Sequence, residues 1–339
     1  MATIKDVAAL AGISYTTVSH VVNRSRPVSE PVRLKVEAAI AQLDYVPSGI
    51  ARSLQSRSTS TVGLLVPNSV NPYFAELARG IEDYCERNGY CVVLCNSDDD
   101  PRRQQNYVRV LLEKRVDGLI IASVGEAAVL RDSLATTRTP IVMIDRTLPG
   151  IDVDLVCIDH EQGGYLATRH LLDLGHRDIA CITGPAGTSA AQQRLNGFHR
   201  ALADFAVPAV AARIVESDFS SAGGYQAAVH LLETAAPTAI FACNDMMGMG
   251  VLRAAAERGI RVPSDLSVIG FDDIQICRYV YPALTTVGQS IRLLGETAAQ
   301  RLLQRVDKTV TGVEQRWVEP QIVLRESTAP RLDLFNEYR

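Results

Sequence analysis

From Thr61 onward, short apolar segments alternate with amphipathic ones, and this alternation is the strongest constraint on the fold. TVGLLVP, YCVVLCN and DGLIIAS are bounded by turn residues, and segments with helical periodicity separate them. A second series runs from DIACITG through TAIFACND to LSVIGFDD. Apolar strands that alternate with helices are typical of parallel sheets covered on both faces. Two such series predict two doubly wound lobes, with a ligand between them at the carboxyl ends of the strands.

Residues 1–46 show only helical patterns. Thr3 is placed to cap a helix that Gly12 ends, and Ser14 is placed to cap the next one. In YTTVSHVVN the three valines repeat at helical spacing, and EPVRLKVEAAIAQLD predicts a third helix. Two helices joined by a tight turn with glycine, followed by a third, are typical of a helix-turn-helix unit.

The second predicted helix carries hydroxyl and imidazole groups opposite its valines, where a solvated face would commonly carry Lys–Glu pairs. Such side chains suit contacts with base edges and thymine methyl groups in a major groove, and Ser14 can approach a phosphate. The charge agrees, because residues 1–60 hold seven Lys and Arg against four acids, although the whole chain has a net charge of −4. The sequence therefore predicts that this helix reads double-stranded DNA.

Composition and motifs exclude several other classes. The seven cysteines show no C-x-x-C spacing, so we expect free thiols and neither a zinc site nor a disulfide framework. The segment MATIKDVAAL has no long apolar core, and no stretch approaches 18 apolar residues. We therefore expect a cytoplasmic protein without a membrane span. Neither G-x-S-x-G, G-x-x-x-x-G-K-[ST] nor H-E-x-x-H occurs, so we expect no enzyme, cofactor or metal.

The segment MATIKDVAALAGISYTTVSHVVNRSRPVSEPVRLKVEAAIAQLDYVPSGIARSL resembles the head of the lac-repressor (LacI/GalR) family of bacterial transcription regulators, in particular its purine and ribose repressors. The likeness continues through KRVDGLII, GHRDIACITGP, FACNDMMGMGVL and VPSDLSVIGFDD. It implies a repressor that acts as a homodimer, with two heads on the halves of a near-palindromic operator and a small-molecule effector in the body.

Pattern and resemblance together divide the chain into three parts. Residues 1–46 are the expected DNA-binding domain, 47–60 the hinge helix and linker, and 61–339 the effector-binding and dimerisation domain. The first lobe is expected at about 61–160 plus 291–320 and the second at about 161–290 plus 321–330. The resemblance implies that Leu54 wedges into the minor groove, an insertion that is known to kink DNA. The expected DNA contacts are Thr3, Ser14, Tyr15, Thr16, Thr17, Ser19, His20, Asn23, Leu54 and Gln55.

Polar and aromatic residues near predicted strand ends are the candidate effector ligands. A sugar site needs side chains that bond two hydroxyls and an aromatic face for the ring. The resemblance places effector contacts at Arg194, Phe219, Asn244, Asp272 and Gln289, with Asn71, Tyr73 and Phe74 on the first-lobe wall. Arg146, at the end of MIDR, is a further candidate. One polar residue at a strand end is more often a helix cap, so this prediction depends on the whole set.

Several alternatives stay open. A purine corepressor is one, although Thr188 and Ala190 replace an arginine and a threonine of the purine repressors, and Arg146 stands where they carry tryptophan. Ribose is not secured either, because Gln192 stands where ribose repressors carry arginine and His160 replaces a frequent asparagine. A sugar-binding protein without a DNA role would share the lobes but not the head. The segment ESTAPRLDLFNEYR has no leucine heptad, which favours a dimer over a tail-built tetramer.

Overall fold

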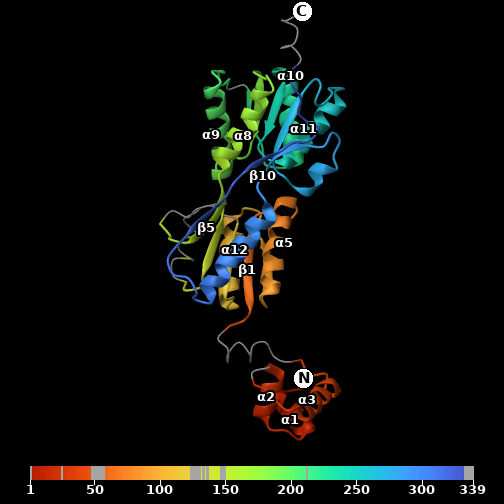
Figure 1. The fold of residues 1–339 in the computed structure, drawn as a ribbon, viewed down its shortest axis with the longest axis vertical. Coiled ribbons are helices and arrows are strands. Elements are labelled where there is room, and N and C mark those ends of the chain that lie inside the picture. Colours follow the sequence, from red (N-terminus) through yellow and green to blue (C-terminus); the bar gives the residue numbers. More distant parts are fainter. Residues whose placement is uncertain are drawn as a thin grey trace, which may run out of the picture. The chain divides into compact units, whose positions relative to one another are not determined.

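The structure is a computed structural model that describes residues 2–23, 26–46, 58–122, 131, 134, 137–145, 150–210 and 213–331. Its contacts fall into two units, Met1–Ser60 and Thr61–Arg339. Figure 1 shows a small helical unit and a larger unit of helices and sheets. Among the described residues, no helix is both long enough and apolar enough to span a bilayer.

The described residues of the first unit form three helices, α1 (Ile4–Ala11), α2 (Tyr15–Asn23) and α3 (Glu30–Gln42), which pack around Val7, Val18, Val36 and Ala39. The predicted caps are present. Thr3 and Asp6 form a reciprocal capping box, and Gly12 ends α1 with a φ of 65°. The Ser14 hydroxyl accepts a hydrogen bond from the Thr17 N–H at 3.2 Å. Short helices with satisfied ends and one apolar face each account for this helix-turn-helix fold.

The second unit consists of two lobes, each with one six-stranded sheet. The strand orders are β11-β5-β4-β3-β1-β2 in the first lobe and β12-β10-β9-β8-β6-β7 in the second. The first-lobe strands are β1 (Thr61–Val66), β2 (Cys91–Asn96), β3 (Gly118–Ile121), β4 (Ile141–Ile144), β5 (Asp154–Ile158) and β11 (Gln315–Val318). The second-lobe strands are β6 (Ile179–Thr183), β7 (Ile214–Glu216), β8 (Ala239–Ala242), β9 (Ser267–Asp272), β10 (Thr285–Gly288) and β12 (Gln321–Val323).

Helices cover both sheets, as the alternating pattern predicts. Alternate residues of β1 and β3 belong to two separate apolar clusters, one with α5 and α12 and one with α6, so these helices lie on opposite faces of the first sheet. Figure 1 shows α5 and α12 side by side. The first-lobe helices are α5 (Pro72–Arg87), α6 (Pro101–Glu113) and α12 (Ile291–Val306). The second-lobe helices are α8 (His160–Asp173), α9 (Ser189–Asp204), α10 (Ser221–Thr234), α11 (Asp245–Glu257) and the short 3₁₀ helix η2 (Gln275–Arg278).

The strand orders show that the chain passes between the lobes after β5, after β10 and after β11. Each passage leaves from the carboxyl end of a strand, so the carboxyl ends of both sheets lie where the lobes meet. The third passage corrects the expectation of two wholly parallel sheets, because β12 pairs antiparallel with β10. Only two residues separate β11 from β12. The chain therefore enters the second sheet at its cleft end and runs away from the cleft, opposite to β10.

Strand β2 is more exposed than strands β1, β3, β4 and β5 of the first lobe. The apolar run YCVVLCN predicts a buried strand, yet Val93 and Leu94 are 37% and 42% exposed. The physical reason is position, since β2 pairs only with β1 and forms one edge of the sheet. This edge leaves an apolar strip on the surface of the first lobe.

Glycines set the spacing of the closely packed helix pairs. A Cβ added at Gly164 in α8 would lie 2.1 Å from the Arg194 carbonyl oxygen, and one at Gly197 in α9 would lie 2.1 Å from the Glu161 carbonyl oxygen. Two further helix pairs have the same arrangement. They are α10 with α11, at Gly224 and Gly250, and α5 with α12, at Gly80 and Gly295. A side chain at any of these positions would force two backbones apart.

We expect Gly164→Ala to lower the free energy of unfolding by about 1–3 kcal/mol, because overpacking must move α9 away from α8. Urea denaturation of both proteins measures the difference. Gly187→Ala is the matched control, since a Cβ there meets no atom within 4 Å. Equal unfolding midpoints for the Gly164 variant and the wild type would contradict the close-packing argument.

Candidate functional site

A cavity of about 350 Å³ lies between the two lobes, at the carboxyl ends of the strands. This volume is within the range of small-molecule sites. Seven of the nine predicted effector residues line it. They are Asn71, Tyr73, Phe74, Arg194, Phe219, Asn244 and Asp272. The structure therefore brings to one site residues from both lobes that lie as much as 201 positions apart in the sequence, from Asn71 to Asp272.

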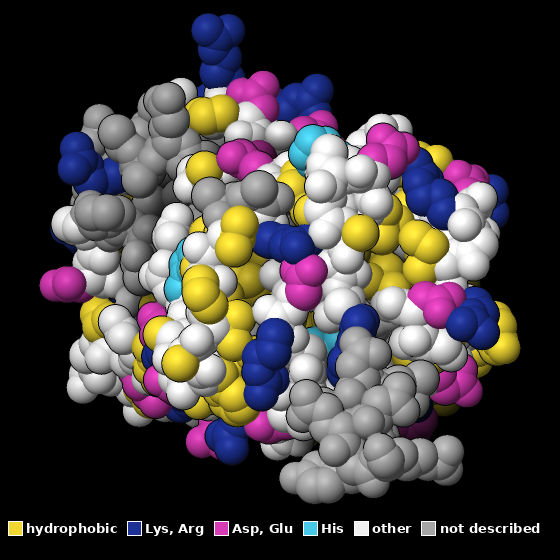
Figure 2. All heavy atoms as spheres, turned by 90° about the horizontal axis from the view of Figure 1, so that it is seen from above, with side chains coloured by type: hydrophobic (Ala, Val, Ile, Leu, Met, Phe, Trp, Pro, Cys, Tyr) yellow, Lys and Arg dark blue, Asp and Glu magenta, His cyan; other side chains and the backbone are white. Residues whose placement is uncertain are grey.

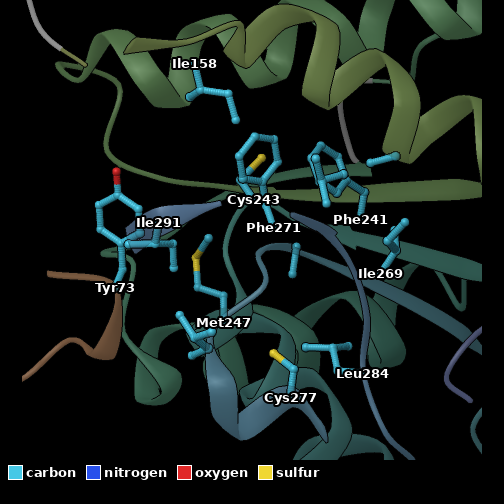
Figure 3. Packing of buried hydrophobic residues seen from close by; sticks show 14 of the residues in the cluster. Tyr73, Ile158, Phe241, Cys243, Met247, Ile269, Phe271, Cys277, Leu284 and Ile291 are labelled. Carbon is cyan, nitrogen blue, oxygen red and sulfur yellow. The ribbon is translucent and has the colours of Figure 1, made fainter. Parts of the chain in front are cut away.

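Arg194 and Asp272 form the charged floor of the cavity in the second lobe. Arg194 projects from α9 and is 6% exposed, while Asp272 ends β9 and is 5% exposed. The guanidinium lies 3.7 Å from the centroid of the Phe271 ring, donates to the Cys243 carbonyl and lies 3.4 Å from Asp272 Oδ1. Figure 3 shows Phe271 beside Cys243 in the apolar cluster. Burial raises the pKa of Asp272 well above its usual range, although Arg194 opposes that shift.

Gln289 lies next to this floor rather than in the cavity wall. Its side chain is fully buried, and its Nε2 donates to Asp272 Oδ1 at 2.6 Å. Its Oε1 is buried without a hydrogen-bond partner among the described residues. Gln289 is not among the residues that line the cavity. Its observed role is to hold the Asp272 carboxylate.

Asn244 and Phe219 are tied together in the wall. The Asn244 side chain caps α11 by accepting from the Met247 N–H at 2.9 Å, and its amide donates to the Phe219 carbonyl at 3.0 Å. Phe219 has a φ of 64°, which is unusual for a residue with a side chain. Its ring lies against Gly184, where a Cβ would lie 2.0 Å from a ring carbon. Asn244 thus positions an aromatic wall residue.

The first-lobe wall contains two aromatic rings and a carboxylate. Asn71 caps α5 by accepting from the Tyr73 N–H at 3.0 Å, and the Tyr73 and Phe74 rings pack edge to face at 4.9 Å. Figure 3 shows the Tyr73 hydroxyl pointing away from the apolar cluster. This hydroxyl donates to Asp145 Oδ2 at 2.8 Å, and the Ile158 N–H donates to Asp145 Oδ1 at 3.1 Å. The wall therefore presents ring faces beside a held carboxylate.

The sequence did not predict several residues that line this cavity, and two of them are titratable groups that face each other between the lobes. Asp145 and His160 both line the cavity, at the end of β4 and the start of α8. Asp145 immediately precedes Arg146, so the strand-end signal in MIDR applies to Asp145 as well. Arg146 itself, and Leu54 and Gln55, are outside the described residues. Among the residues that the structure describes, no cluster of three His, Cys, Asp or Glu side chains could hold a metal ion.

The candidate DNA-reading surface is formed by α2 and the turn before it. Tyr15 is 53% exposed, and Thr16 is also exposed at the helix start. Several of the other predicted residues form hydrogen bonds within the unit. The Ser14 and Thr17 hydroxyls lie 2.9 Å apart, Asn23 Nδ2 donates to Ser19 Oγ at 3.2 Å, and the Thr3 hydroxyl serves the cap of α1. His20 is half-buried on the same helix. Tyr15 and Thr16 are therefore exposed on this surface, as are Thr3 and Ser14, whose hydroxyls also bond within the unit.

We expect Asn244→Ala to lower stability more than Asn244→Ser. Serine keeps an acceptor for the α11 cap, and both variants lose the amide that donates to the Phe219 carbonyl. The difference between the two variants should be about 1 kcal/mol, the usual value of an N-cap. Urea unfolding of both variants measures it. If the serine and alanine variants unfold at the same midpoint, Asn244 does not stabilise the protein by capping α11.

Comparisons with known proteins identify the family of this chain. Residues 3–48 match the profile of bacterial regulatory proteins of the lacI family, and residues 59–321 match that of periplasmic binding proteins and the sugar-binding domain of the LacI family. The chain is 41% identical to the transcriptional repressor PurR of Aliivibrio fischeri strain MJ11, over 98% of this chain and 100% of that protein. It is also 41% identical to the ribose operon repressor of Haemophilus influenzae, over 96% of this chain and 98% of that protein.

Solved structures show the same architecture. A lac repressor dimer bound to operator and an anti-inducer is 33% identical, with a TM-score of 0.87 over 97% of this chain and 99% of that one. A LacI-family regulator from Enterococcus faecium with bound ribose is 35% identical, with a TM-score of 0.74 over 80% of this chain and 99% of that one. This chain therefore belongs to the LacI family of bacterial transcription regulators, as a DNA-binding repressor with an effector-binding domain and not an enzyme.

Proposed function

We propose that this repressor binds a near-palindromic operator as a homodimer and that a sugar in the cavity between its lobes controls the affinity for the operator. The main support for this proposal is that Arg194, Asp272 and aromatic rings surround one cavity. A guanidinium offers several fixed donors and a carboxylate offers acceptors, so together they can bond neighbouring hydroxyls. The rings of Phe219, Tyr73 and Phe74 offer apolar faces to the C–H side of a sugar.

A purine corepressor is the second candidate, and the similarity to PurR proteins favours it. The cavity wall supports it less. Thr188, which stands where purine repressors carry arginine, donates its hydroxyl to the Pro185 carbonyl at 2.9 Å and does not line the cavity. Ala190 lines the cavity with a methyl group, which cannot read a base edge by hydrogen bonding. The described wall thus lacks polar groups at two positions where a base would need them.

The proposed homodimer has physical support in the first lobe. The exposed Val93 and Leu94 on the edge strand β2 form an apolar strip that a second copy can cover. An effector changes operator affinity only if it binds two arrangements of the lobes unequally, typically by about 1–3 kcal/mol. We propose that the hinge at 47–60, including the minor-groove contact of Leu54, responds to that change.

We assign DNA binding to the first unit. The face of the molecule in Figure 2 mixes acidic and basic side chains among its described residues, without a broad field of one sign. A mixed surface is a poor partner for a polyanion. The net positive charge of residues 1–60 and the solvent-facing side chains of α2 therefore support the head as the DNA-binding part.

The test of effector control starts from an operator selected out of random duplexes. We expect one sugar among D-ribose, D-xylulose and cellobiose to change operator affinity by about 5–150-fold, and a purine base to leave it unchanged. Arg194→Ala should lose this response and keep its affinity for the operator within about threefold. Arg200→Ala is the control, because Arg200 lies on the same helix but pairs with Glu161 at the surface. A full response in the Arg194 variant, or a response to the purine alone, would contradict the sugar proposal.

The test of DNA reading uses His20→Ala. We expect it to weaken binding to the selected operator by about 1–3 kcal/mol, because a base-reading side chain is lost, and to leave binding to random duplex nearly unchanged. Fluorescence anisotropy on both duplexes at one fixed salt concentration measures the two effects. An equal loss on both duplexes would show that His20 does not read bases.

A further inference from the structure

His160 and Asp145 face each other across the first passage between the lobes. Asp145 belongs to the first lobe, where Tyr73 and the Ile158 N–H hold its carboxylate at 2.8 and 3.1 Å. His160 is the first residue of α8 in the second lobe and is 2% exposed. Its Nε2 lies 3.5 Å from Asp145 Oδ1, slightly beyond an ordinary hydrogen bond, and this nitrogen is buried without a partner among the described residues.

The other imidazole nitrogen determines which tautomer is present. Arg194 Nε donates to His160 Nδ1 at 3.4 Å. A guanidinium has no acceptor, so Nδ1 must carry the lone pair and the neutral ring must carry its proton on Nε2. The donor of His160 therefore points at the carboxylate of Asp145. A small closing motion of the lobes would bring this N–H into hydrogen-bond range.

We propose that His160 is a positioning residue that links effector occupancy to lobe closure. Its Nδ1 orients Arg194 toward the effector, and its Nε2–H approaches Asp145 across the passage between the lobes when the lobes close. This inference rests on the proposed effector site and adds a residue that acts between its two walls. The link consists of Asp272, Arg194, His160, Asp145 and Tyr73, in that order. A ligand that orders Arg194 thereby favours the closed position of the first-lobe wall.

Acid should break this link. A proton on Nδ1 would face the Nε–H of Arg194, so two donors and two positive charges would meet, and Arg194 would turn away. The charged groups around the imidazole are Asp145 after β4, Arg194 on α9 and Asp159 beside it in the chain. Burial, supported by Arg194 and opposed by Asp145, lowers the pKa of His160 below its ordinary 6.5. Protein stability should consequently fall as the pH drops below 6.5, because the unfolded chain takes up this proton first.

Two variants separate the two contacts of the ring. His160→Asn places an amide oxygen near the Nδ1 position and keeps an acceptor for Arg194, but it does not reach Asp145. His160→Gln extends an amide N–H toward Asp145. Neither variant titrates. We expect the glutamine variant to recover more of the wild-type response than the asparagine variant if closure on Asp145 is the function of the ring.

The first experiment measures D-ribose affinity of the full chain by calorimetry without DNA, so that His20 on the DNA-reading helix does not contribute. Wild-type affinity should fall about tenfold for each pH unit below the pKa of His160. Both variants should show a shallower profile than the wild type, because the imidazole is gone while Asp272, whose pKa burial also raises, is unchanged. The same pH dependence in wild type and His160→Asn would overturn the proposal.

The second experiment needs no ligand. Nitrogen NMR of histidine-labelled protein should show His160 with its proton on Nε2 and a pKa below 6.5. A proton on Nδ1, or an ordinary titration, would overturn the proposal even if the effector site itself is correct. Failure of D-ribose to bind at any pH would count against ribose as effector, and the nitrogen signals alone would then decide the role of His160.

Discussion

The second unit depends on one constraint, namely that all three passages between the lobes occur at the carboxyl ends of parallel strands. Strand ends leave backbone groups and the first turns of helices near each other, which is where α/β proteins bind ligands. Every residue that lines the cavity follows from that arrangement, with Asp145 after β4, His160 after β5, Asn244 after β8 and Asp272 at the end of β9. The same constraint explains why β12 runs antiparallel, since the last passage also enters at the cleft.

The cavity is held together by polar groups that are costly to bury alone. Arg194 and Asp272 are each nearly inaccessible, and each stays in place because it has several partners. Removing one partner of such a set leaves a buried group unsatisfied, which costs more than an average hydrogen bond contributes. A ligand with hydroxyl groups can exchange contacts with this set, whereas an apolar ligand cannot. The unpartnered nitrogen of His160 and oxygen of Gln289 lie at the edges of the same set.

Packing between helices controls this polar set from outside. The Arg194 carbonyl is the atom that Gly164 approaches, so the distance between α8 and α9 determines where the guanidinium enters the cavity. Phe219 depends in the same way on Gly184 below its ring and on the Asn244 amide. These small residues carry no chemistry of their own. They permit backbones to approach closely enough for chemical groups from different elements to meet.

The sequence by itself determined the order of strands and helices, the caps of α1 and α2, the two-lobed fold class and the family, because periodicity, capping and motif spacing are local properties. It also predicted seven of the residues that line the cavity. Only the tertiary structure decided how they are used. Asn244 holds Phe219, Gln289 holds Asp272, and Asp145 meets His160, while Val93 and Leu94 on an apolar strand stay exposed. The reason is that Arg194 meets a carbonyl 49 positions away and a carboxylate 78 positions away, and such partners are fixed by packing rather than by spacing.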